Sequence, residues 1–181
     1  MTTLMDRARP VLLPEVGRAA LAATRGDAAV HAGTALMLLA GLRPGEVADL
    51  LVRDWILGAD PKVTVPGRSG PAIRVAPTAA AAVNAYLAGR DAELDEPLLA
   101  GLERDTLPYL FADAARQAQL TVHAHDLRRA AMAVVLEDGT PVRHLEAYFG
   151  TSASPARAGL PPIDDGYDRG IAALLEQTFA G

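Results

Sequence analysis

The chain of 181 residues contains no cysteine, which excludes disulfide bonds, thiolate metal sites and a cysteine nucleophile. Aromatic residues make up only 4% of the sequence, while 50% of it is apolar, mostly alanine and leucine. This composition favours packed helices over a β-sandwich. A chain of this length builds one well-filled core, so we expect a single domain over residues 1–181.

Long apolar runs are also missing. No stretch reaches the roughly 18 apolar residues that suggest a membrane-spanning helix, and charged residues interrupt the N-terminus too early for a signal peptide. We therefore expect a cytoplasmic protein with no membrane partner. The four histidines are not spaced with carboxylates as a ligand set, so we expect neither a metal nor a cofactor.

The sequence has no excess of basic residues. Its formal net charge is −5, and Lys62 is the only lysine beside sixteen arginines. A phosphate backbone attracts clustered cations, so this balance argues against a general polyanion-binding protein. Any binding to nucleic acid would have to come from a local group of cations.

Apolar periodicity, with glycine and proline between the periodic segments, predicts a mostly helical chain. Residues 28–40 are apolar on all sides, as in a central buried helix, with Asp27 as its cap and Gly41 as its stop. The β-like runs 62–65 and 72–76 are joined by "PGRSGP", which predicts a hairpin. Further helices are expected at 14–23, from 44, and at 77–89, 107–119, 125–136, 141–149 and 168–179.

Two short motifs stand out against this pattern. The first is Gly41-Leu42-Arg43 with Glu46 three residues later, directly after the buried helix. The second is "HDLRR", which places His125, Arg128 and Arg129 at the start of an apolar helix. With the hairpin between them and a helix ending at Gly150 after them, the motifs resemble the catalytic domain of the tyrosine recombinase (phage integrase) family over about residues 11–180.

The resemblance implies a mainly α fold with a small antiparallel β-hairpin or sheet, the integrase-like DNA breaking-rejoining fold. It also implies that the retained arginines contact a phosphate. An arginine fork suits this task because it donates two hydrogen bonds to phosphate oxygens and keeps its charge. On a helix, His125 and Arg128 lie at i and i+3, about 5–6 Å apart at Cβ, so both can face one phosphate.

In this interpretation His125 passes a proton, and Glu46 orients Arg43 or a neighbouring histidine. Arg68, in the hairpin, and Arg129 are further phosphate-binding candidates. A plainer interpretation of the same residues remains open. Arg43 would then be a surface arginine, Glu46 a residue that favours the positive end of a helix, and His125 with Asp126 a capping pair.

Three positions depart from the family pattern. The family's nucleophilic tyrosine follows a His or Trp by nine residues, and these two positions fall here on Leu160 and Thr151. Leucine has no nucleophilic atom, and threonine is a weaker donor than imidazole. Arg68 stands where the family has a general-acid lysine, and its high pKa makes it a poor proton donor. We therefore predict a degenerate site that does not cleave DNA.

Tyr167 is the only tyrosine downstream of Gly150, and it is the candidate for a displaced nucleophile. It follows Pro161 and Pro162, and neighbouring aspartates would repel a phosphodiester. A second tyrosine, Tyr148, lies before Gly150 at a spacing that suggests core packing.

Three functions are left open. The first is a DNA-binding or recombination-accessory protein that binds duplex DNA weakly and does not cleave it. The second is an integrase scaffold that now serves a small anionic ligand or substrate, or a protein partner or second copy of the chain. The third is an active strand transferase that uses Tyr167.

The single domain is expected to comprise an arm at 1–10, a core at 11–150 and a degenerate segment with the last helix at 151–181. The family's N-terminal core-binding domain has no counterpart in this sequence. The chain would then be a truncated form, a protein that stands alone, or one whose partner supplies that domain.

Overall fold

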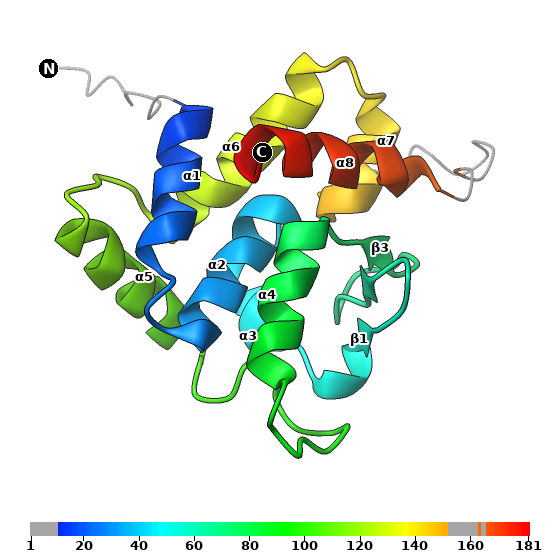
Figure 1. The fold of residues 1–181 in the computed structure, drawn as a ribbon. Helices are drawn as coiled ribbons and strands as arrows, with labels where there is room; N and C mark the ends of the chain where they lie inside the picture. The colour runs from blue at the N-terminus through cyan, green and yellow to red at the C-terminus, as the bar shows by residue number, and fades with distance from the viewer. Residues whose placement is uncertain (1–10, 152–162, 164–165) are drawn as a thin grey trace, which may run out of the picture.

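A computed structural model describes residues 11–151, 163 and 166–181. Eight α-helices in these ranges surround one core, and a three-stranded sheet lies at one side (Figure 1). The helices are α1 (Pro14–Ala23), α2 (Ala28–Leu39), α3 (Pro44–Ala48), α4 (Pro77–Leu87), α5 (Thr106–Gln117), α6 (Ala124–Glu137), α7 (Val142–Phe149) and α8 (Tyr167–Phe179). The mainly α architecture with a small sheet predicted from the sequence is confirmed.

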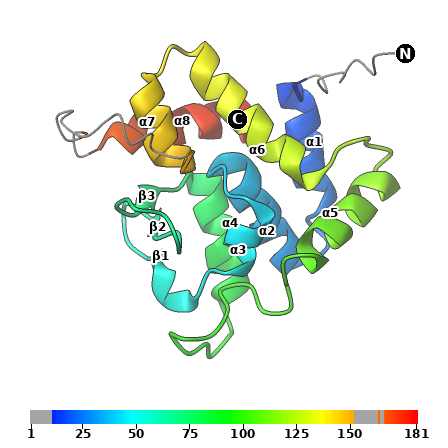
Figure 2. The same cartoon turned by 180° about the vertical axis from the view of Figure 1, so that it is seen from behind.

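Helix α2 forms the centre of the core. Asp27 caps it as predicted, because its Oδ1 accepts hydrogen bonds from the backbone amides of Ala29 and Val30 at 3.0 and 3.1 Å. Most of its side chains are fully buried, since α1, α4, α5, α6 and α8 all pack around it. The views from both sides show α2 enclosed by these helices (Figures 1 and 2).

The sheet is antiparallel and very short. Strands β1 (Trp55–Ile56), β2 (Lys62–Val63) and β3 (Ile73–Arg74) pair in the order β1-β2-β3, after a short 3₁₀ turn at Val52–Asp54. The hairpin between β2 and β3 was predicted, and β1 adds a third strand to it. The β2–β3 loop contains Arg68.

Helix α8 closes the structure against α1, α2, α6, α7 and β3. Its buried face consists of Asp168, Ile171, Ala172, Leu175 and Phe179. On α8, Glu176 accepts hydrogen bonds from the amide and hydroxyl of Thr78 at 2.9 and 2.7 Å, which supplies the cap that α4 lacks in its own sequence. No helix in the described ranges combines the length and apolar character needed to cross a bilayer.

Candidate phosphate-binding site

Glu46 brings three arginines together. It lies in the first turn of α3, where its carboxylate accepts hydrogen bonds from the amide of Arg43 at 2.7 Å and from the guanidinium of Arg43 at 3.2 Å. Arg68 donates to the same carboxylate through Nε at 2.9 Å and Nη2 at 2.6 Å. Nη1 of Arg128 lies 3.8 Å from Oε2. We call Arg43, Arg68 and Arg128 the guanidinium cluster.

The three arginines differ in exposure. The side chain of Arg43 is 48% exposed, whereas those of Arg68 and Arg128 are only 10% and 8% exposed. The two buried guanidinium groups also donate to main-chain carbonyls. Arg68 Nη1 donates to Tyr148 at 2.6 Å, and Arg128 donates to Gly41 through Nη1 and to Phe149 through Nη2, the latter at 2.6 Å.

Two glycines allow this close packing. Gly41 and Gly150 both have left-handed backbone conformations, with φ of +63° and +61°. A Cβ on Gly41 would overlap the ring of Phe149, and a Cβ on Gly150 would lie 2.6 Å from Nε of Arg68. The site therefore depends on glycine at both positions for reasons of backbone conformation and of space.

The charges of the cluster shift the pKa values of its members. Burial alone would raise the pKa of Glu46, but the hydrogen bonds from Arg68 and Arg43 and the charges of Arg68 and Arg128 outweigh it, so the pKa is lowered. Burial, followed by repulsion from Arg43, lowers the pKa of Arg128 to about 10. Both groups remain charged at neutral pH.

The pKa shift of Glu46 leads to a prediction about acid stability. Because the folded-state pKa lies below the ordinary value of 4.5, the stabilisation by this carboxylate is complete above that value and is lost as the pH falls through the lowered pKa. We expect Glu46→Gln to lower the free energy of unfolding by about 2 kcal/mol at neutral pH, with the difference from the wild type shrinking in acid. Urea unfolding at several pH values measures this difference.

Asp49→Asn is the matched control, because Asp49 pairs with Arg104 through side chains that are 43% and 69% exposed. Such a surface pair contributes little, so this variant should differ little from the wild type at any pH. A Glu46→Gln deficit that stays constant down to acid pH would contradict the role given to the carboxylate charge.

The residues of the second motif separate onto different faces of α6. Arg128 points into the cluster, whereas Arg129 and His125 are exposed. Arg129 lies 3.6 Å from Asp126. His125 forms no hydrogen bond or ion pair with the cluster within the described part of the chain. Asp126 accepts a hydrogen bond from the amide of His123, so Asp126 provides the capping interaction that the plainer interpretation assigned to His125 and Asp126 together.

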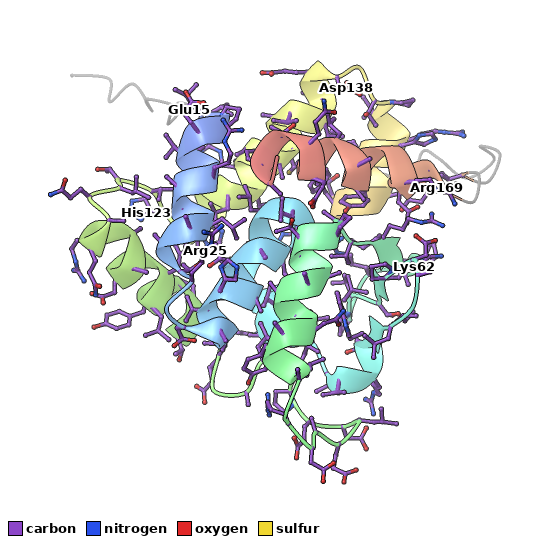
Figure 3. The ribbon with its side chains drawn as sticks, viewed as in Figure 1. Glu15, Arg25, Lys62, His123, Asp138 and Arg169 are labelled. Carbon is purple, nitrogen blue, oxygen red and sulfur yellow. The ribbon has the colours of Figure 1, made fainter. Side chains whose placement is uncertain are left out.

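His123, at the start of α6, lies at the side of the molecule opposite Lys62 on β2 and Arg169 on α8 (Figure 3). Among the residues that the structure describes, no group of three or more histidines, aspartates and glutamates is placed to hold a metal ion.

Of the three positions that depart from the family pattern, Arg68 belongs to the cluster, and the other two follow α7 in the sequence. Thr151 follows Gly150 directly, and its hydroxyl is buried with no hydrogen-bond partner among the described residues. Leu160 lies outside the described residues. Tyr167 is the first residue of α8, and its ring lies 5.5 Å from that of His144, centroid to centroid.

The Tyr167 hydroxyl is buried, also without a hydrogen-bond partner in the described ranges. Burial, together with the charge of Asp168, raises its pKa to about 12. Tyr148 is fully buried, as its spacing suggested, and its hydroxyl donates to the carbonyl of Arg74 at 2.8 Å. Neither phenol is a ready nucleophile in this arrangement.

Some contacts at the site could not be read from the sequence. The carbonyls of Gly41, Tyr148 and Phe149 are main-chain groups. Every residue type has such a carbonyl, so the sequence does not indicate which of them accept a hydrogen bond from an arginine. The pairing of Arg74 on β3 with Asp168 on α8, at 2.6 Å, joins residues 94 positions apart. Asp168 was expected to repel a phosphate, but its charge is paired with Arg74.

The architecture around this cluster is similar to that of solved recombinase and integrase structures. A solved structure of XerA recombinase matches it with a TM-score of 0.69 and 20% identity, over 91% of this chain and 65% of that one. The integrase of mycobacterium phage Brujita matches with a TM-score of 0.68 and 21% identity, over 94% of this chain and 63% of that one. These likenesses establish the fold.

A lambda integrase dimer bound to a COC′ core site matches with a TM-score of 0.60 and 14% identity, over 86% of this chain and 62% of that one. The chain thus spans slightly less than two thirds of each of these three proteins. It covers 94% of the separate lambda integrase catalytic core, with a TM-score of 0.58 and 14% identity. No protein-family model and no curated protein matches the sequence.

Proposed function

We propose that the chain is a recombinase-type DNA-binding module that contacts phosphate through the guanidinium cluster and does not cleave DNA. The observation that carries the proposal is the convergence of three arginines on the single carboxylate of Glu46. One carboxylate offsets only one of the three positive charges, so the cluster retains an excess that favours an anion. Arg129 and His125 lie exposed on other faces of α6 than Arg128, so the proposed phosphate contact depends on the three arginines of the cluster.

The absence of cleavage is proposed from the side chains at the family's catalytic positions. Leucine at 160 has no atom that can attack phosphorus, and Thr151 and Arg68 replace the imidazole or indole and the lysine. Tyr167, the displaced candidate, has a buried hydroxyl and a raised pKa, which oppose its ionisation. A solved structure of lambda integrase bound to DNA is among those that match, which makes duplex DNA the first ligand to test.

Salt-dependent binding to a duplex tests the proposal. We expect weak binding at low salt that falls as salt rises, because arginines at phosphates displace counterions. Arg43→Gln removes the most exposed member of the cluster and should weaken binding and reduce the slope of log K against log salt by about 1. Fluorescence anisotropy with a labelled duplex at several salt concentrations measures both quantities.

The matched control is Arg116→Gln, which makes the same change of charge at a 73% exposed position on α5, on the far side of α2 from the sheet (Figure 2). This variant should keep the wild-type affinity and slope. Undetectable binding at low salt, or equal behaviour of the two variants, would remove the proposed role of the cluster.

Incubation with a nicked duplex tests the absence of cleavage. We expect no covalent protein–DNA adduct on a denaturing gel. An adduct that disappears in Tyr167→Phe would instead establish an active strand transferase with a displaced nucleophile.

A small anionic ligand is the second candidate, and the burial of Arg68 and Arg128 favours it. Side chains that are only 10% and 8% exposed can contact a compact phosphate group more readily than a rigid duplex. Stabilisation by one phosphate-bearing metabolite in a thermal-shift screen, without stabilisation by DNA, would support this alternative.

A further inference from the structure

Two members of the guanidinium cluster also hold the end of a helix. Arg68 donates to the carbonyl of Tyr148 and Arg128 to the carbonyl of Phe149, each at 2.6 Å. These carbonyls are consecutive and belong to the last turn of α7, where carbonyls lack partners within the helix. Two positive groups at the negative end of a helix also interact favourably with its dipole.

The same contacts join the end of α7 to the end of α2. Arg128 donates to the carbonyl of Gly41, two residues beyond the last residue of α2, as well as to Phe149. The ring of Phe149 packs directly on Gly41, which has no side chain to separate them. The position of Arg128 therefore affects both helix ends at once.

Repulsion within the cluster works against these contacts. Burial most of all, and then the charges of Arg43 and Arg68, disfavour the charged form of Arg128, while the charge of Glu46 favours it. A guanidinium carries five N–H groups, and the contacts described here use three on Arg68 and two on Arg128. Two N–H groups on Arg68 and three on Arg128 are thus outside these contacts, and an anion that bound them would offset the repulsion and leave the helix-end contacts intact.

We propose that an oxyanion bound at the guanidinium cluster stabilises the last turn of α7, so that site occupancy and the order of this helix end are linked. The inference depends on the proposed affinity of the cluster for anions. Linkage requires that the anion bind more tightly when the helix end is formed, because only then do Arg68 and Arg128 lie together.

Amide hydrogen exchange at Gly150 and Thr151 tests the inference, since both amides donate to the carbonyl of Glu146 at the end of α7. The probe is inorganic phosphate, added to the full chain, and its binding is followed separately through the Nε–H resonances of the arginines. We expect phosphate to slow exchange at both amides several-fold. Arg116→Gln serves as the control and should respond as the wild type does.

Arg68→Lys separates charge from geometry. Lysine keeps the positive charge, but one ammonium cannot span Glu46 and the carbonyl of Tyr148 as the arginine fork does. We expect exchange at Gly150 and Thr151 to accelerate about tenfold without phosphate, and the slowing by phosphate to become smaller.

Phosphate that binds without changing exchange, or Arg68→Lys with wild-type exchange, would overturn the linkage while leaving the site itself intact. Failure of phosphate to bind would overturn both the linkage and the anion site. Slowed exchange with phosphate but no affinity for duplex DNA would keep the linkage and reject the DNA-binding function.

Discussion

Gly41→Ala is expected to lower the free energy of unfolding by about 3 kcal/mol, which corresponds to roughly 6–12 °C in Tm for a chain of this size. Two effects add at this position. The φ of +63° is strained for any residue with a side chain, and the new methyl group would overlap the ring of Phe149. That ring is fully buried and cannot move away without disturbing the core. Thermal unfolding followed by circular dichroism measures the effect.

Gly170→Ala is the control with the opposite sign. Gly170 lies within α8, has an ordinary helical conformation and has open space around its Cα. Alanine favours the helix over glycine by about 0.5–1 kcal/mol, so this variant should be slightly more stable than the wild type. Equal and small effects of the two substitutions would show that the contact between Gly41 and Phe149 is not tight in solution.

Removal of the Asp168 carboxylate should be comparably damaging. Asp168 is 3% exposed, and it accepts hydrogen bonds from the amide of Arg74 at 2.7 Å and from the guanidinium of Arg74 at 2.6 Å. Asp168→Ala leaves the guanidinium beside an empty buried space, and breaking a buried pair in this way costs about 3 kcal/mol. We expect the midpoint of the single urea-unfolding transition to fall, because the pair joins β3 to the first turn of α8.

Asp60→Ala provides an internal comparison, since Asp60 pairs with the same arginine from a half-exposed position. Water can replace this carboxylate, so the variant should unfold close to the wild-type midpoint. If the two substitutions lowered the stability equally, Arg74 would need both carboxylates. The burial of Asp168 would then not make its ion pair contribute more than that of Asp60.

The helices were predictable because each has a local signal. Asp27 accepts hydrogen bonds from two amides of the first turn of α2, and the all-round apolar pattern of residues 28–40 could only suit a central helix. His31, within that helix, is partly buried, and its Nδ1 lies 3.1 Å from the carbonyl oxygen of Leu21. Strand β1 was not predicted, because Trp55 and Ile56 are not part of a β-like run such as those at 62–65 and 72–76.

The candidate site was predictable only in part. The two motifs identified Arg43, Glu46 and Arg128, and the structure brings all three together with Arg68. The i, i+3 spacing of His125 and Arg128 gave their angular relation on α6, but not which side of the helix the core would cover. Arg128 is buried as a result, and His125 is exposed.

The inward contacts of the site arginines had no signal in the sequence. Arg128 contacts the carbonyl of Gly41 across 87 positions, and Arg68 contacts that of Tyr148 across 80. Such contacts depend on how helices pack, and an arginine that will bind a carbonyl looks the same in sequence as one that will bind a phosphate. The sequence therefore indicated which residues lie close together, and the structure was needed to show which groups they contact.

The small sheet depends on contacts with the helices around it. Strands of two residues each cannot persist in water by themselves. Instead, hydrogen bonds from Arg68 join the hairpin loop to α3 and α7. A hydrogen bond from the hydroxyl of Tyr148 joins β3 to α7, and one from Arg74 joins β3 to α8. The shape of the hairpin thus depends on α3, which precedes it in the chain, and on α7 and α8, which follow it. During synthesis its full set of contacts can form only after the C-terminal third of the chain has been made.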